Sequence, residues 1–262
     1  MPKVPVRDIE INYNEEGAGF PLILVHGLNG DLTAWALVMP KLSHRYRTIA
    51  LDVRGHGESS KPDQPYSIKG FSEDLYNFMN ELKIPKAHIA GFSMGGAIAQ
   101  QFALNHPEMA RSLVLVSTFS YFDESTHQTF THLRQILRQE GYPAYFDEVV
   151  KLAFTPQFVT ANSGAIAELK EKRVRSNSPV AIGWATDACM AFDLKKEIAR
   201  ISLPTLIVSG RTDALTPIHL AEQIQLSIQE SEWKILEGVG HIIPIEKASQ
   251  LAQFMLEFLE KH

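Results

Sequence analysis

Ser93 stands between paired glycines in the stretch HIAGFSMGGAIAQ, residues 88–100, with Gly91 and Gly95 each two residues away. The residues before this serine form a short apolar run typical of a strand, and those after it are typical of a helix that ends at Pro107. A G-x-S-x-G sequence at a strand-to-helix junction makes a sharp turn that exposes the serine hydroxyl above a sheet. The stretch therefore predicts a nucleophile, provided that the chain also supplies a base, an acid and an oxyanion site.

A serine hydroxyl needs a general base, and the chain contains ten histidines. His241, in GVGHIIPIE, follows the last expected strand. It would therefore lie on a loop at the carboxyl end of the sheet, where ligands bind in open α/β folds. His26 and His56 lie in glycine-rich turns, where we expect local hydrogen bonds, and the others fall in helical, polar or strand-forming stretches. His241 is the expected base.

The base must in turn be oriented by an acid. Asp213, in SGRTDALTP, comes just after the strand expected at residues 203–210 and would lie at the same edge of the sheet. Asp52 follows the strand expected at residues 46–51 and is the alternative, but its setting in DVRGHG favours a structural role. We therefore predict Asp213 as the acid.

The tetrahedral intermediate of acyl transfer needs two donors for its oxyanion. Met94 directly follows the serine, and its backbone N–H would lie at a helix N-terminus, where the helix dipole also favours negative charge. The turn HGLNG, residues 26–30, follows the apolar run PLILV and can supply the second donor, which we assign to the N–H of Leu28.

Strand-like and helix-like segments alternate along most of the chain. Two short strands are expected within residues 4–13, and later ones at 20–27, 46–51, 86–92, 110–118, 203–210 and 231–238. The expected helices are residues 31–43, 67–83, 93–107, 217–228 and 245–262. This alternation predicts βαβ units and a mostly parallel sheet with helices on both faces.

The alternation stops between about residues 120 and 200, where every segment looks helical. A connection of this length is far longer than usual and predicts an inserted helical cap. The cap is rich in aromatic residues, of which we take Trp184 as a substrate contact. It also carries cations that could hold an acidic substrate, although a charge run usually forms a solvated face. These are Arg134, Arg138, Lys172, Arg173 and Arg175.

The composition of the chain limits its possible binding partners and its cellular compartment. The net charge of −5 gives no basic footprint, so we expect neither nucleic acid nor anionic membrane as a partner. Cys189 is the only cysteine, which excludes an intramolecular disulfide and a cysteine-based metal site. With no secretory signal and no apolar run of membrane-spanning length, we expect a cytoplasmic protein. The sequence leaves the oligomeric state open.

Five motifs, HGLNG, DVRGHGESSKP, GFSMGG, SGRTDALTP and GVGHIIPIE, resemble the α/β-hydrolase superfamily in order and spacing across the whole chain. The order Ser93, Asp213, His241 matches the nucleophile–acid–base order of that superfamily. The resemblance implies a sheet of about eight strands and a triad that needs no cofactor or metal. It also implies a core domain of residues 1–119 and 201–262, with the cap, 120–200, inserted between strands six and seven.

Within the superfamily, the chain looks most like small carboxylesterases and 3-oxoadipate enol-lactonases, because residues 180–217 resemble the end of an enol-lactonase cap. Haloalkane dehalogenases and epoxide hydrolases of this fold place Asp where Ser93 stands. We therefore expect a carboxylesterase or lactonase acting on small to medium acyl groups of a small-molecule ester or lactone. The alternatives left open are 3-oxoadipate enol-lactonase proper, a lyase or thioesterase, and a slow-turnover small-molecule receptor.

Overall fold

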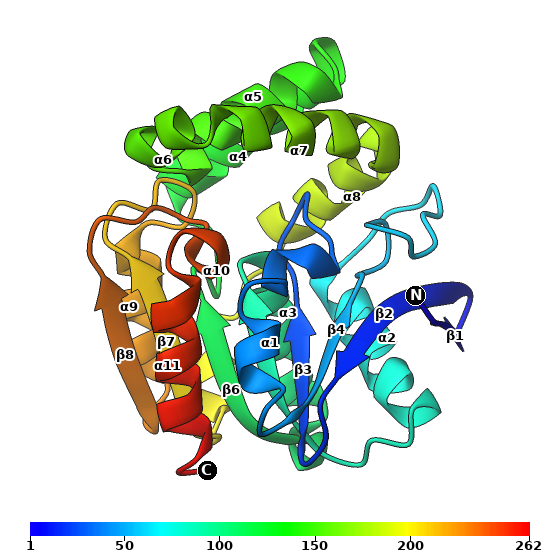
Figure 1. Ribbon diagram of the computed structural model, residues 1–262, viewed down its shortest axis with the longest axis vertical. Coiled ribbons are helices and arrows are strands. Elements are labelled where there is room, and N and C mark those ends of the chain that lie inside the picture. Colours follow the sequence, from blue (N-terminus) through cyan, green and yellow to red (C-terminus); the bar gives the residue numbers. More distant parts are fainter.

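The computed structural model describes all 262 residues and contains one eight-stranded sheet with helices on both faces (Figure 1). The strands are β1 (Lys3–Val6), β2 (Ile9–Glu16), β3 (Pro21–Val25), β4 (Arg47–Leu51), β5 (Ala87–Phe92), β6 (Ala110–Val116), β7 (Thr205–Gly210) and β8 (Ser231–Leu236). They are ordered β1-β2-β4-β3-β5-β6-β7-β8 across the sheet. The β1–β2 and β2–β4 pairs are antiparallel and the others are parallel, which confirms the predicted α/β fold.

Alternate side chains of the central strands enter two separate apolar layers. Ile23 and Val25 of β3 belong to the layer that also holds α2 (Ile68–Glu81), α3 (Met94–Asn105) and α9 (Ile218–Ser227). Leu22 and Leu24 belong to the layer on the other face, together with the 3-10 turn η1 (Leu32–Trp35), α1 (Met39–Leu42) and α11 (Ala248–Leu259). Burial on both faces explains why these strands are continuous apolar runs in the sequence.

Two expected helices are interrupted. The segment predicted at residues 31–43 forms η1, capped by the Asp31 carboxylate on the Thr33 N–H, and then the separate four-residue helix α1. The segment predicted at 245–262 is divided into α10 (Ile243–Glu246) and α11, with Lys247 at φ −133° between them. Pro244 in the first turn of α10 favours an earlier start, because its missing N–H costs nothing there.

Five α-helices and the 3-10 turn η3 (Ile198–Arg200) lie between β6 and β7. We call the five α-helices the cap helices: α4 (Glu124–Gln139), α5 (Tyr142–Ala153), α6 (Pro156–Ala161), α7 (Ser163–Ser176) and α8 (Pro179–Met190). They lie across the end of the sheet at which the parallel strands point (Figure 1). An isolated bridge between Tyr121 and Asp193 brings together the two chain segments that enter and leave the cap helices. This bridge is the only β pairing outside the main sheet.

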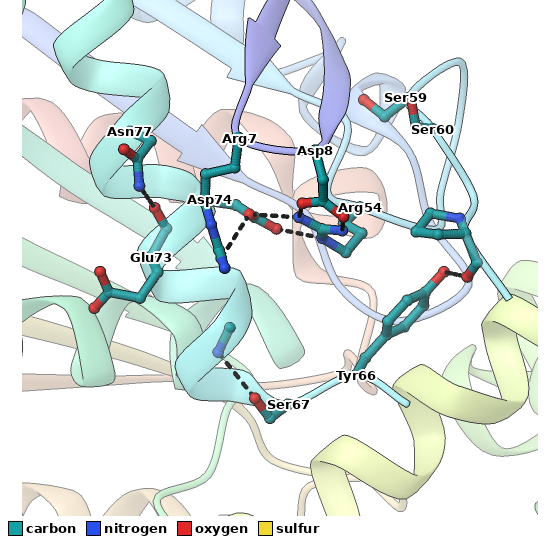
Figure 2. Close-up of polar contacts among 12 residues, drawn as sticks. Arg7, Asp8, Arg54, Ser59, Ser60, Tyr66, Ser67, Glu73, Asp74 and Asn77 are labelled. Atoms are coloured by element: carbon teal, nitrogen blue, oxygen red, sulfur yellow. Dashed lines mark hydrogen bonds and ion pairs between the residues drawn. The ribbon is translucent and has the colours of Figure 1, made fainter. Parts of the chain in front are cut away.

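Arg54, in the loop after β4, joins three parts of the core (Figure 2). Its guanidinium donates to Asp74 on α2 at 2.7 and 2.8 Å, and to Asp8, between β1 and β2, at 2.9 and 2.7 Å. The hydrogen bonds from Arg54 hold the pKa of Asp8 well below its ordinary value. Two-pronged pairs of this kind fix position as well as charge, so the loop that begins at Asp52 is held firmly against the core.

Candidate active site

Ser93 occupies the turn between β5 and α3, with φ 54° and ψ −118°. A residue other than glycine adopts such a conformation only where its surroundings enforce it. Gly91 and Gly95 allow the turn, because a Cβ on Gly91 would overlap the backbone of Gly95, and a Cβ on Gly95 would overlap the carbonyl of Val25. The sequence pattern that predicted the turn therefore has a steric cause.

Asp213 and His241 come from the loops after β7 and β8 and meet beside this turn. His241 Nδ1 lies 2.8 Å from Asp213 Oδ2, and both side chains are buried. The other carboxylate oxygen, Oδ1, accepts the N–H groups of Leu215 at 2.9 Å and Thr216 at 2.8 Å. The Thr216 hydroxyl donates to Asp213 Oδ2 at 2.7 Å. This network is best satisfied with the proton on Nδ1, which leaves His241 Nε2 free to accept one.

Ser93 and His241 line one small cavity of about 50 Å³. No hydrogen bond joins their side chains, and such bonds are often long in ligand-free enzymes. The rest of the wall is mostly apolar and comes from the core and the cap helices: Leu28, Asn29, Phe92, Phe130, Leu133, Tyr145, Val149, Ala153, Leu215 and Ile242. A second cavity of about 130 Å³ shares six of these residues and is also lined by Arg173. Together they form a largely apolar space beside the serine.

The two predicted oxyanion donors flank Ser93. Met94 is the first residue of α3, so its N–H has no carbonyl one turn earlier to bond. Leu28 follows Gly27, whose added Cβ would lie 2.9 Å from Ser93 Cβ, so the loop after β3 approaches the serine closely. Neither N–H donates a hydrogen bond within the protein. Both are therefore available to a bound oxygen, and their role as an oxyanion hole stays a prediction.

Both carboxylate oxygens of the alternative acid, Asp52, accept hydrogen bonds from residues outside the site. It accepts the Leu32 N–H at 2.7 Å, the Asn12 side-chain amide at 2.7 Å and the Glu58 N–H at 2.8 Å. These bonds join the loops after β3 and β4 and make no contact with His241. The structural interpretation of the DVRGHG segment is therefore correct.

His26 and His56 make the local hydrogen bonds expected of them. His26 Nδ1 lies 2.7 Å from the Gly27 carbonyl, and its Nε2 accepts the Val53 N–H at 2.9 Å. His56 Nδ1 lies 3.0 Å from the Arg54 carbonyl. Burial lowers the pKa of His26 and lowers that of His56 to about 3, so both rings are neutral. They support the loops around the site and face no substrate space.

Trp184 is not brought to the cavity beside Ser93. Its indole N–H donates to Asp63, in the loop between β4 and α2, at 3.0 Å, and Trp184 is absent from the walls of both cavities. The structure thus gives this side chain a contact between cap and core in place of the expected position at the substrate. No local feature of the sequence distinguishes these two roles for an aromatic residue.

The expectation that the cap cations are solvated is wrong for Arg173. Its side chain is only 7% exposed and lies 2.7 Å from the Asp31 carboxylate. Arg134 pairs with Asp187 at the surface of the cap helices, as a solvated charge would. Arg173 lies in the charged run EKRVRS on α7. Nothing in this run predicts which of its charged side chains is buried.

Comparison with known proteins assigns the chain to a family. The model of the family described as the alpha/beta hydrolase fold matches residues 21–248. The chain belongs to the alpha/beta hydrolase family. This hydrolase is 34% identical over 248 residues to the dihydrolipoyllysine-residue acetyltransferase component of the acetoin cleaving system of Pseudomonas putida. That match covers 93% of the chain and 64% of the longer protein, so the chain corresponds to only part of this relative.

Two other relatives match over nearly their whole length. The hydrolase is 28% identical over 263 residues to a putative carbamate hydrolase, RutD, of Azorhizobium caulinodans, which covers 98% of each chain. The crystal structure of the enol-lactonase from Burkholderia xenovorans LB400 superimposes with a TM-score of 0.93 at 26% identity, covering 99% of this chain and 100% of that one. The family supports a hydrolase activity. None of the helices combines the length and apolar character that crossing a bilayer requires.

Proposed function

We propose that this alpha/beta hydrolase cleaves carboxylic esters through an acyl-enzyme. Ser93 Oγ attacks the carbonyl carbon while His241 Nε2 accepts its proton, and His241 then gives that proton to the leaving alcohol. Water, activated by the same nitrogen, releases the acid. Asp213 keeps the proton of neutral His241 on Nδ1 and stabilises the imidazolium that His241 becomes. The N–H groups of Leu28 and Met94 bind the oxyanion.

The observation that carries this proposal is the 2.8 Å contact between His241 Nδ1 and Asp213 Oδ2, with His241 and Ser93 on the wall of one cavity. The strained backbone at Ser93 supports it, because strain of this kind clusters at functional sites. A serine needed only to close a turn would require neither a buried acid–base pair nor two unused N–H donors.

The substitution Ser93→Ala tests the proposal. Loss of the nucleophile should reduce turnover of p-nitrophenyl acetate by several orders of magnitude, to the residual level that binding and the oxyanion donors alone provide. Ser72→Ala is the matched control, because it removes a buried serine hydroxyl on α2 that has no hydrogen-bond partner. A folded Ser93→Ala protein with near-normal turnover contradicts the proposal.

The size and lining of the cavities favour small to medium, apolar acyl groups. The spaces of about 50 and 130 Å³ are walled mainly by aliphatic and aromatic side chains. Their one cation, Arg173, is already paired with Asp31. Across a series of p-nitrophenyl esters, we expect kcat/KM to peak at short chains. A maximum at long chains contradicts this part of the proposal.

A lactone is the second candidate substrate, and the structural similarity to the enol-lactonase favours it. The same serine chemistry opens a lactone ring, with the leaving alcohol remaining attached to the acid that is released. A panel of small lactones and open-chain esters of matched size, assayed by acid release, separates the two. Activity that depends on Ser93 and is at least tenfold greater on lactones would assign the lactonase function.

A further inference from the structure

Asn29, directly after the proposed oxyanion donor Leu28, is bound by two segments of the cap helices. Its Oδ1 accepts the hydroxyl of Tyr142, the first residue of α5, and the side-chain amide of Asn177 at 2.9 Å. Asn177 lies between α7 and α8, and its amide is also 2.8 Å from the Tyr142 hydroxyl. One residue of the loop after β3 is thus held by side chains 113 and 148 residues away in the sequence.

The backbone of Asn29 needs this support. Its φ of 64° lies in the left-handed region, which asparagine tolerates better than most residues but which is still unfavourable. Tyr142 and Asn177 are only 4% and 7% exposed, so little water competes for their hydrogen bonds. Burial raises the pKa of Tyr142 to about 12, so its hydroxyl stays protonated and donates to Asn29.

The same loop has a second tie to the cap helices. Asp31 lies 2.7 Å from Arg173 on α7, and both side chains are buried. Burial alone would raise the pKa of Asp31, but Arg173 and the hydrogen bond from Thr33 hold it at about 2. The Asp31 carboxylate therefore stays charged, and its pair with Arg173 intact, well into the acidic range. Residues 29–31 are fixed from outside the core by both hydrogen bonds and an ion pair.

We propose that Tyr142 and Asn177 are positioning residues that hold Asn29, and through it the Leu28 N–H, where the oxyanion forms. This inference rests on the proposed ester hydrolysis. The oxyanion hole is complete only while α5 and the α7–α8 link are seated on the loop. A displacement of about 1 Å at such a donor can cost 100-fold in rate, so weak contacts at Asn29 have a large effect on turnover.

Tyr142→Phe removes the hydroxyl and keeps the ring. We expect kcat on p-nitrophenyl acetate to fall ~10-fold, a fraction of the ~100- to 1,000-fold that complete loss of an oxyanion donor costs. KM should stay within twofold, because the donor acts mainly in the transition state. The matched control is Lys170→Met, which breaks an exposed ion pair of α7 with Asp147 on α5 and touches neither the loop nor the cavities.

A trifluoromethyl ketone gives a readout that a purely structural role would not change. Ser93 Oγ adds to the ketone carbon, its proton passes to His241, and the former carbonyl oxygen becomes an oxyanion held by the two N–H groups. The affinity for this inhibitor should fall in Tyr142→Phe by the same factor as kcat/KM. In Lys170→Met both quantities should match the wild type.

Asn29→Gly is the second variant, because glycine adopts φ 64° without strain but offers no side-chain acceptor. It should lose at least as much kcat as Tyr142→Phe, because it also removes the acceptor of the Asn177 amide, and the double variant should be no worse than Asn29→Gly alone. Unchanged kcat and ketone affinity in both single variants overturn the inference, as does an equal loss in Lys170→Met. If Ser93→Ala abolishes turnover while these variants are normal, only the inference fails. If Ser93→Ala is active, the proposed function fails first.

Discussion

Replacing Ser93 by glycine should stabilise the protein relative to replacing it by alanine. Alanine at this position keeps the strained backbone, with φ 54°, whereas glycine relaxes it. Strain of this kind costs about 1–3 kcal/mol, and the greater flexibility of glycine in the unfolded chain offsets about 0.5–1 kcal/mol of the gain. The expected advantage of Ser93→Gly over Ser93→Ala is therefore about 0–2.5 kcal/mol, or up to roughly 10 °C in Tm.

Ser72 provides the control for this comparison. It is buried inside α2, its hydroxyl has no partner, and its backbone is helical. There the order should reverse, with alanine better than glycine by about 1 kcal/mol, because glycine is a poor helix former. Thermal and urea unfolding of the four variants measure both differences. If Ser93→Gly proves less stable than Ser93→Ala while the Ser72 pair behaves as expected, the strain argument is refuted.

Three further predictions concern other parts of the molecule. Asp213→Asn should lower kcat about 10⁴-fold with little change in Tm, because an amide facing Nδ1 favours the wrong tautomer of His241; a loss below tenfold would contradict this. Burial lowers the pKa of His88 from 6.5 to about 4, so the unfolded chain binds a proton at His88 more readily than the folded protein does. The free energy of unfolding therefore decreases as the pH falls below 6.5, by roughly 3 kcal/mol near pH 4. His88→Gln should therefore lose less Tm than the wild type between pH 6.5 and 4, and parallel curves would reject the assignment. Gly95→Ala should lower Tm and activity together because its Cβ has no room, whereas Gly164→Ala, with nothing within 4 Å, should leave both intact or raise Tm slightly.

Much of the sheet could be predicted because its strands are buried on both faces and so appear as short apolar runs closed by turns. The serine turn could be predicted for a related reason, since overlap between backbones at Gly91 and Gly95 leaves a visible sequence pattern. Asp213 and His241 could be placed because parallel strands deliver their following loops to one edge of a sheet. These features are local in sequence or follow from topology.

The contacts between the cap helices and the core could not be predicted in the same way. Tyr142 and Asn177 reach Asn29 across more than a hundred residues, and an asparagine in a turn looks the same with or without such partners. Arg173 is buried by its pairing with Asp31, although its neighbours on α7 are charged and mostly exposed. The pattern of charged residues along a helix predicts which face would be solvated in an isolated helix. It does not predict which of these residues another part of the chain covers.

The bridge between Tyr121 and Asp193, reinforced by the Leu194 N–H on the Ser120 carbonyl at 2.9 Å, closes the base of the segment that carries the cap helices. Directly paired residues of antiparallel strands have Cα atoms only about 4.5–5.5 Å apart. The segment that carries the cap helices thus begins and ends at nearly one point, from which residues 194–204 lead to β7, so exchanging it for one of another length need not move β6 or β7. A replacement cap would still have to renew the contacts that the present cap makes with the loops of the site, including the Ala153 carbonyl that accepts the His241 N–H at 2.9 Å.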